Sequence, residues 1–387
     1  MSSHSYKIIK ELRNEFFLLK ANLYKNNIIT NEILQNMFNL SSIIIELENN
    51  YNGLLSRSSS EYSIDNLVLN DLPIFDIDVV SKKMNDWNFD FFTIQHSIDL
   101  VIYTYFMFID IFDFDNLKIN LNSFYNCVID ISKKYNNNPY HNFQHAVTVT
   151  HFIYLIIKTV NLDKYLSKYK LFSLLFSGLV HDIDHPGTDN LFETNKKSFL
   201  SLQYNDKSIL ENHHCSTAFF IIQQDNIKLF KNLNNIEFTE IRSTIIESIL
   251  STDMKNHTSL MTTLKSSNII ENELLLCKLI LHASDLCNQL KCFDVYKNGI
   301  KRIHREMIIQ KEKEEQLVLP ITKNIDINNN NELVQNEINF SIFFVKPIWS
   351  IIINLFPELT FLLNEHDNNV NILLKNNYSL SESESET

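Results

Sequence analysis

The sequence contains very little glycine and proline, with 4 Gly and 6 Pro among 387 residues. Sandwiches and barrels connect their strands through turns that depend on these residues, so a chain with so few of them is a poor candidate for a sheet-based fold. The apolar fraction of 44%, by contrast, is ample for a packed core. Together these features predict an all-α protein.

Paired cysteines, excess basic charge and long apolar runs are also lacking. The five cysteines are odd in number and include no CxxC pair, which argues against a disulfide framework and against a thiolate zinc site. A formal net charge of −12 disfavours nonspecific binding to nucleic acid or to an anionic membrane. Leu171–Val180 is too short to span a membrane, Phe340–Phe356 is interrupted by Lys346 and Pro347, and the N-terminus lacks the order of a signal peptide. We therefore expect a cytoplasmic protein without a nucleic-acid or membrane partner.

The composition divides the chain into four segments. Residues 1–55 carry two apolar-periodic segments typical of helices, and residues 56–83 form a polar, Ser-rich linker. The N-terminal helical extension suits either a regulatory or homodimerising hairpin or additional packing for the main core. Residues 84–365 are expected to form one catalytic domain, in which the Asn-rich stretch 324–331 is a mobile surface loop. Residues 366–387, which end in alternating Ser and Glu, are expected to be a disordered acidic tail.

Two histidines four residues apart follow Pro139. Proline is favoured in the first turn of a helix, so His141 and His145 are expected on one helical face. Taken alone, such an HxxxH pair more often lies on the surface, or is hydrogen-bonded within the core, than binds a metal. Its significance therefore depends on the rest of the chain.

Two apolar helical segments lead into acids and histidines. Leu171–Val180 runs into the segment 181–190, which reads HDIDHPGTDN, and Leu274–Leu281 is followed by Asp285. Buried imidazoles and carboxylates are costly unless they are paired or bound to metal. Mixed nitrogen and oxygen ligands suit zinc or manganese, and an oxygen-rich site suits magnesium. HxxxH, HDxDHxGxxN and the downstream acid together predict a two-metal phosphohydrolase site with Asp285 as a ligand.

With these motifs the sequence resembles the class I cyclic nucleotide phosphodiesterases. Residues 181–192 match the family's HDxxHxGxxNx followed by an apolar residue. Further similarities are YHNFQHA to YHNxxHA (140–146), YNDKSILENHH to YNDxSVLENHH (204–214), STDMKNH to ATDMxxH (251–257), KPIW to HPLW (346–349) and MNDW at the N-terminal edge (84–87). The resemblance covers about residues 84–365.

The resemblance implies a compact multi-helix phosphodiesterase domain with an HD-type metal site. It implies that the tighter metal, usually zinc, is held by His145, His181, Asp182 and Asp285, with Asp182 bridging to a second ion, magnesium or manganese. It implies that waters on the second ion are held by His185, Glu211, His214 and Thr252. His141 is the implied general acid, and Glu211 is the candidate for the acidic neighbour that keeps it protonated. The implied nucleotide contacts are Tyr140, Met254, Asn288, Glu337 and Phe340.

The position that contacts the purine departs from the family. There, a Gln lies ten residues before the Pro of HPLW and a stacking Phe lies seven before it, and counting back from Pro347 gives Glu337 and Phe340. A carboxylate only accepts hydrogen bonds, which fits the adjacent N–H donors of guanine better than the edge of adenine. The alternatives are a register shift caused by the Asn-rich insertion, or a Glu337 that is protonated or faces solvent. Gln289 and Cys292 also replace prolines that are usual in the family.

The expected activity is metal-dependent hydrolysis of the 3′ phosphoester bond of a 3′,5′-cyclic nucleotide, cyclic AMP or cyclic GMP with a lean to cyclic GMP. The product is the nucleoside 5′-monophosphate, and the reaction would end second-messenger signalling. Two alternatives compete with this prediction. One is an HD-type phosphohydrolase of noncyclic nucleotides, and the other is a catalytically weak scaffold that retains the fold.

Overall fold

The computed structural model describes residues 77–323, 325–326 and 329–375. The chain divides between Lys83 and Met84 into two units, and of the first unit only the start of helix α3 is described. The two predicted N-terminal helices, most of the predicted linker and the alternating Ser and Glu of the tail lie outside the described residues.

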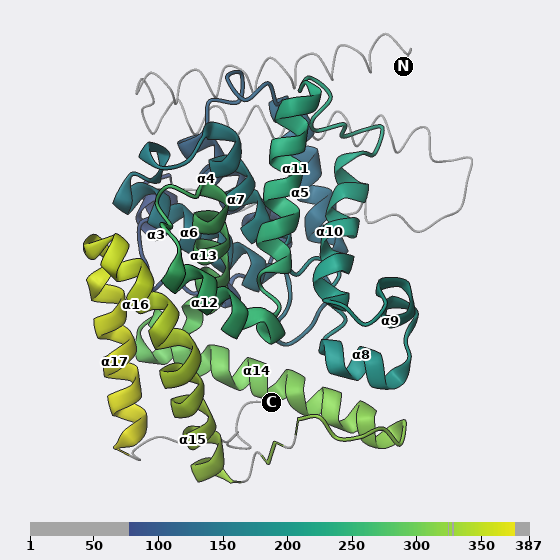
Figure 1. The fold of residues 1–387 in the computed structure, drawn as a ribbon, viewed down its shortest axis with the longest axis vertical. Helices are drawn as coiled ribbons and strands as arrows, with labels where there is room; N and C mark the ends of the chain where they lie inside the picture. The colour runs from purple at the N-terminus through teal and green to yellow at the C-terminus, as the bar shows by residue number, and fades with distance from the viewer. Residues whose placement is uncertain (1–76, 324, 327–328, 376–387) are drawn as a thin grey trace. The chain divides into compact units, whose positions relative to one another are not determined.

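Within the described ranges the chain is helical and forms no strand, so the all-α prediction is confirmed (Figure 1). The α-helices are α3 (Ile77–Met84), α4 (Ser97–Ile111), α5 (Leu121–Lys134), α6 (Phe143–Val160), α7 (Lys168–Val180), α8 (Asn190–Lys196), α9 (Phe199–Tyr204), α10 (Ile209–Ile222), α11 (Asn235–Leu250), α12 (His257–Ser266), α13 (Glu273–Asp285), α14 (Phe293–Gln316), α15 (Asn330–Phe340), α16 (Lys346–Leu355) and α17 (Thr360–Leu374). The 3-10 helices are η3 (Phe91–Thr93), η4 (Leu162–Lys164), η5 (Met254–Asn256), η6 (Cys287–Leu290) and η8 (Pro357–Leu359), and η7 (Ser341–Val345) is a π-helix.

Helix α7 lies at the centre of the domain. Every residue from Leu171 to Val180 is buried, and α6, α11 and α13 pack against it. Gly178 allows α6 to approach closely, because a Cβ there would lie 2.8 Å from Cδ1 of Ile153 and 3.2 Å from Cα of Thr150. The polar residues that follow Val180 therefore enter the interior rather than the surface.

Helix α6 begins later than predicted. Asn142 caps α6, its side chain accepting from the backbone N of His145 at 3.2 Å, so the helix begins at Phe143 and not at Pro139. The prediction that both histidines lie on one helical face is wrong, because His141 lies in the turn before α6 and asparagine is a strong N-cap. Helix α7 ends at Val180, the last residue of the predicted segment, and a turn carries the chain onward.

The C-terminal boundary of the domain also differs from the prediction. Helix α17 continues beyond residue 365, so residues 366–374 belong to the helical domain and not to a disordered tail. Val370 and Leu373 explain the extension, because they pack into an apolar cluster with residues of α14 and α15. Helix α15, capped by the side chain of Asn329, begins at Asn330 inside the stretch that was predicted to be a loop.

The stretch Asn330–Leu355 is long and apolar enough to cross a membrane by length and composition alone. Core helices of soluble proteins meet the same criterion. Within it, Trp349 is fully buried, and its Nε1 donates to the carbonyl of Ala283 at 3.1 Å. Its ring meets that of Phe152 edge-on at 5.7 Å. Helix α16 therefore supports the end of α13, just before Asp285.

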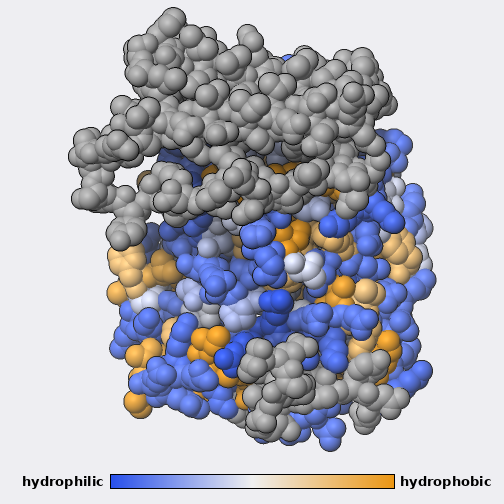
Figure 2. Space-filling model, turned by 180° about the vertical axis from the view of Figure 1, so that it is seen from behind, coloured by the Kyte–Doolittle hydropathy of each residue, from blue (hydrophilic) through white to orange (hydrophobic). Residues whose placement is uncertain are grey.

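Exposed large apolar side chains among the described residues include Phe199, Leu202, Phe220 and Val318. The face seen in Figure 2 is mostly polar, and its apolar residues form separate patches among the polar ones. Single exposed apolar residues are ordinary on a folded protein and do not by themselves indicate a binding surface.

Trp349→Ala should lower the free energy of unfolding by about 3–5 kcal/mol, because it removes a fully buried aromatic side chain and its hydrogen bond. Chemical denaturation followed by circular dichroism measures this change. The matched control is Phe343→Ala on the exposed side of η7, where the side chain is 67% exposed and a change below about 0.5 kcal/mol is expected. Equal losses in the two variants would contradict the supporting role of Trp349.

Candidate active site

Two histidines and two aspartates each bring one ligand atom to a common point. The ligand atoms of His145, His181, Asp182 and Asp285 all lie within 4.8 Å of one another. Nε2 of His145 and Nε2 of His181 are each 3.1 Å from Oδ1 of Asp285. The same nitrogens lie 3.4 and 3.3 Å from Oδ2 of Asp182. The structure thus brings together the four residues that the sequence assigned to the tighter metal.

The hydrogen bonds behind this cluster show that it fits a cation. Nδ1 of His181 lies 2.9 Å from the carbonyl of Gly178, and Nδ1 of His214 lies 2.6 Å from that of Ile183. Since a carbonyl only accepts, each ring donates from Nδ1, and its neutral form presents a bare Nε2 lone pair to the carboxylates. Buried lone pairs that face carboxylate oxygens are unfavourable unless positive charge lies between them. The donor set therefore suits a divalent metal ion.

The ligands come from three helix ends. His145 lies in the first turn of α6, His181 follows the last residue of α7, and Asp285 is the last residue of α13. Because α6 and α13 both pack on α7, these ends meet inside the domain. Asp182 and His185 come from the turn after α7.

That turn is held in an uncommon backbone conformation. Asp184 has a φ of 62°, in the left-handed region, which Asp tolerates better than most residues. Its carboxylate lies 2.9 Å from Nε2 of His213 and 3.0 Å from Nζ of Lys134. These two contacts hold the turn that directs Asp182 and His185 towards the cluster.

The two aspartates of the cluster are charged. Burial alone would raise the pKa of Asp182, but a protonated His181 beside it, together with hydrogen bonds from His145 and His181, holds this pKa well below its ordinary value. The same histidines outweigh burial at Asp285, whose pKa is also lowered. Two negative charges therefore lie side by side, which increases the affinity for a cation.

His141 is paired with an acid that the sequence reasoning did not identify. Its Nδ1 lies 2.5 Å from Oε1 of Glu306 on α14, and Oε2 of Glu306 accepts from the backbone N of Tyr140 and of His141 at 3.0 Å each. Burial lowers the pKa of His141, yet Glu306 outweighs it and raises the pKa to about 9. The pKa of Glu306 falls to about 2 despite its burial. The pair is an imidazolium and a carboxylate, which suits His141 to donate a proton.

Glu211 was the expected partner of His141, but the structure places it elsewhere. Nδ2 of Asn190 donates to both of its oxygens, at 3.2 and 3.0 Å. Burial and the charge of Asp253 raise the pKa of Glu211 to about 7. Thr252 is buried, and its hydroxyl donates to the carbonyl of Ile249 at 2.8 Å, which leaves the hydroxyl oxygen as an acceptor.

His185 and His214 adjoin the cluster through Asp182, since one ligand atom of each of the three residues lies within 4.8 Å of the others. Nδ1 of His185 accepts from the backbone N of Gly187 at 3.0 Å, so its Nε2 carries a hydrogen and acts as a donor. The His185 ring stacks on that of His141 with centroids 4.3 Å apart. His185 is therefore suited to hold a water or an anion, whereas His214 is suited to bind a cation.

Three of the residues predicted to contact a nucleotide lie on separate elements. Tyr140 is buried, with its ring 4.6 Å from that of His145, and Met254 opens η5 with 38% of its surface exposed. Nδ2 of Asn288 in η6 donates to the carbonyl of Tyr296 at 3.1 Å. Its inward position requires Gly299, because a Cβ there would lie 2.3 Å from Oδ1 of Asn288.

Glu337 and Phe340 lie on α15. Phe340 stacks on Phe344 with centroids 5.4 Å apart. The side chain of Glu337 is only 13% exposed and contacts His304 and Gln289, so it does not face solvent. The backbone is helical without a break from Glu337 through η7 into α16, and the Asn-rich stretch lies before Glu337. The insertion therefore does not fall between Glu337 and Pro347.

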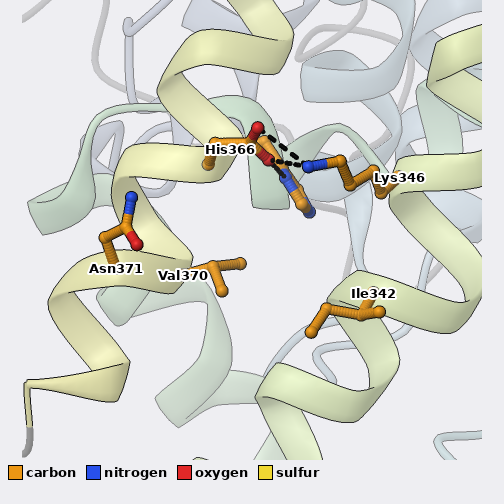
Figure 3. A pocket seen from close by; sticks show the side chains of 6 residues that line it. Ile342, Lys346, His366, Val370 and Asn371 are labelled. Carbon is orange, nitrogen blue, oxygen red and sulfur yellow. Dashed lines mark hydrogen bonds and ion pairs between the residues drawn. The ribbon is translucent and has the colours of Figure 1, made fainter.

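A cavity of about 190 Å³ lies apart from these residues, between η7 and α17 (Figure 3). It is lined by Ile342, Lys346, His366, Asp367, Val370 and Asn371. Nζ of Lys346 lies 2.9 Å from both carboxylate oxygens of Asp367. The charges of these two residues therefore neutralise each other at the rim of the cavity. It contains none of the predicted site residues.

Comparisons with known proteins agree with this arrangement. A family model described as 3′5′-cyclic nucleotide phosphodiesterase matches residues 140–366. The chain is 32% identical over 263 residues to the high affinity cGMP-specific 3′,5′-cyclic phosphodiesterase 9A of Drosophila melanogaster, and 27% identical over 314 residues to a probable 3′,5′-cyclic-AMP phosphodiesterase (pde-4) of Caenorhabditis elegans. These alignments cover 66% and 76% of this chain but only 17% and 46% of those proteins.

Among solved structures, the chain is similar to the phosphodiesterase domain of the RhoPDE fusion protein from the choanoflagellate Salpingoeca rosetta. The TM-score is 0.71 at 31% sequence identity, and the match covers 77% of this chain and 97% of that domain. The helical fold is therefore shared with that domain over nearly its whole length.

Glu306→Gln should lower the pKa of His141 from about 9 to its ordinary value near 6.5 or below, because burial then acts without the compensating charge. A titration of the His141 ring protons by nuclear magnetic resonance measures this pKa. Glu332→Gln, at an exposed position in the first turn of α15, is the control and should leave it unchanged. If His141 still titrates near 9 without the Glu306 carboxylate, another group holds its proton.

Proposed function

We propose that this chain, which belongs to the 3′,5′-cyclic nucleotide phosphodiesterase family, hydrolyses the 3′ phosphoester bond of a 3′,5′-cyclic nucleotide and so ends a second-messenger signal. The observation that carries the proposal is the position of the imidazolium of His141 beside the acidic cluster. Its ring lies 5.6 Å from that of the predicted ligand His145. The proposed proton donor thus lies next to the proposed cation-binding cluster.

The metal assignment is part of the proposal. We assign a tightly held zinc ion to His145, His181, Asp182 and Asp285, and a second ion, magnesium or manganese, to the other side of Asp182. Waters of the second ion are assigned to His185, Glu211, His214 and Thr252. Two divalent ions held there would neutralise the anionic phosphodiester and lower the pKa of a shared water towards about 7.

The chain's own residues complete the reaction. A water that has lost a proton to solvent bonds through its oxygen to phosphorus while the bond between phosphorus and O3′ breaks, and O3′ leaves as an alkoxide unless it receives a proton. We assign this proton to Nε2 of His141, because its Nδ1 is engaged by Glu306, which keeps the ring charged. The phosphate stays on O5′, and the product is the nucleoside 5′-monophosphate.

The nucleotide contacts and the cellular setting are proposals as well. We assign the nucleoside to Tyr140, Met254, Asn288, Glu337 and Phe340, with cyclic GMP preferred because Glu337 offers only acceptors. The name of the Drosophila relative agrees with this preference.

We place the enzyme in the cytoplasm and assign the catalytic domain to residues 84–374. Homodimerisation through residues 1–55 is one role that we propose for the N-terminal segment.

His141→Ala should reduce the turnover of cyclic nucleotides at least about a hundredfold, because general acid catalysis contributes a factor of this order. Steady-state kinetics measure turnover, and elemental analysis of the same sample should show unchanged metal content. His96→Ala, at an exposed position before α4, is the matched control. Wild-type turnover in His141→Ala would remove His141 from the mechanism.

Protein purified without chelator should retain zinc or another transition metal, and His181→Ala should lose most of it, because that variant removes one of four ligands. Inductively coupled plasma mass spectrometry measures the metal per chain. His96→Ala serves again as the control. Equal metal content in His181→Ala and wild type would contradict the ligand assignment, and a metal-free wild type would favour a scaffold.

A further inference from the structure

The side chain of Asn138 joins the residue assigned as the proton donor to a residue assigned to bound water. Its Nδ2 donates to the backbone carbonyl of His141 at 2.8 Å and to that of His185 at 2.8 Å. Carbonyl oxygens only accept, so the amide must present its nitrogen to them, and each of its two hydrogens goes to one carbonyl. We call these two hydrogen bonds the Asn138 clamp.

The Asn138 clamp connects two turns that are far apart in the sequence. Asn138 and His141 lie between α5 and α6, whereas His185 lies between α7 and α8. The backbone of such turns is outside the hydrogen-bond ladder of the helices, so its position depends on individual contacts. The rings of His141 and His185 are stacked, with centroids 4.3 Å apart. The clamp therefore fixes the backbones of two residues whose side chains are also in contact.

Asn138 is itself held in place by its surroundings. Nδ2 of Asn142, the N-cap of α6, donates to its backbone carbonyl at 2.8 Å. Gly187 passes close to its side chain, because a Cβ at that position would lie 2.7 Å from Oδ1 of Asn138. Gly187 also has a φ of 70°, which glycine adopts readily and other residues rarely adopt. The chain thus leaves room for Asn138 where it bonds to the turn after α7.

The two asparagines before Asn138 differ from it in their contacts. Nδ2 of Asn136 donates to the carbonyl of His185 at 2.9 Å, and its second acceptor, Oδ1 of Asp184 at 3.4 Å, belongs to the same turn. Asn136 therefore supports one turn, whereas Asn138 bridges two. Asn137 is exposed and lies between them. It offers a control of the same residue type at the adjacent position.

We propose that Asn138 is a positioning residue, which holds the imidazole of His141 at the place from which it protonates the departing O3′. This inference rests on the proposed function. General acid catalysis requires a donor within hydrogen-bond reach of the atom that it protonates, and a displacement of about 1 Å can slow a reaction about a hundredfold. Without the clamp, the turn that carries His141 is free to shift relative to the turn that carries His185.

Metal binding should not depend on the clamp. Both of its hydrogen bonds end on residues outside the cluster of His145, His181, Asp182 and Asp285. Loss of the clamp is therefore expected to impair proton donation while the chain keeps its metal. This outcome distinguishes a positioning residue from one that only stabilises the fold, because a general loss of structure would affect both.

The first test measures kcat and KM of the full chain, with zinc and magnesium present, for the cyclic nucleotide that wild type turns over faster. Asn138→Asp is nearly isosteric but lacks both hydrogens, and Asn138→Ala removes the amide. Each variant should lower kcat at least about tenfold and change KM less than about threefold. Asn137→Ala is the matched control and should keep the kcat of wild type. Elemental analysis and thermal melting should show unchanged metal content and a folded chain in every variant.

The second test replaces O3′ of the cyclic nucleotide with sulfur, which needs no proton in order to leave. The oxygen of a water that has lost a proton to solvent bonds to phosphorus, the bond between phosphorus and sulfur breaks, and sulfur keeps the electron pair as a thiolate. A thiol has a pKa of about 8.5, far below that of an alcohol, so the thiolate is a stable leaving group. The loss of kcat in the Asn138 variants should therefore be at least about fivefold smaller with this analogue than with the oxygen substrate. His141→Ala should show the same difference.

Unchanged kcat in both Asn138→Asp and Asn138→Ala would overturn the inference. An equal loss of kcat with the oxygen and the sulfur substrate would also overturn it, because that result indicates damage to the metal cluster or to the fold. If Asn138→Ala does not fold, Asn138→Asp and the sulfur analogue still decide the question. The proposed function fails on different results, namely a wild type that hydrolyses neither cyclic nucleotide with divalent ions present, or full turnover in His141→Ala.

Discussion

The site depends on one electrostatic constraint: two carboxylates, 14% and 24% exposed, face the Nε2 atoms of His145 and His181. Asp182 and Asp285 supply the negative charge, and the carbonyl of Gly178 fixes which nitrogen of His181 remains bare. Such an arrangement is unfavourable without positive charge at its centre. The fold brings these charges together by ending three packed helices at the same place.

A second charge pair is kept distinct from the first. Glu306 engages Nδ1 of His141, and its other oxygen takes two backbone donors, which leaves it little freedom to move towards the cluster. His185 lies between the two sets, stacked on His141 and close to Asp182. The positive charge of His141 and that of a cation held at the cluster would therefore be balanced by separate acids, so changing one acid need not empty the other site.

The cluster of His145, His181, Asp182 and Asp285 could be predicted from the sequence because each residue lies within a dense local motif or at the end of an apolar helix. The start of α6 could not be predicted, because both Pro139 and Asn142 are residues that often begin a helix. Only the structure shows that Asn142 is the N-cap. Glu306 escaped prediction for a different reason. Helix α14 carries many charged residues, and nothing local distinguishes the one acid that turns inward. The surroundings of Glu337 depend on α14, η6 and η7, which are far apart in sequence.

The contact between α6 and α7 at Gly178 has a consequence for the cluster. A Cβ there would lie 2.8 Å from Cδ1 of Ile153 and 3.2 Å from Cα of Thr150, so a larger residue would push the two helices apart. His145 lies in the first turn of α6, and His181 directly follows α7. Their ring centroids are 5.2 Å apart. A larger residue at Gly178 would therefore change the separation of two proposed ligands from outside the cluster.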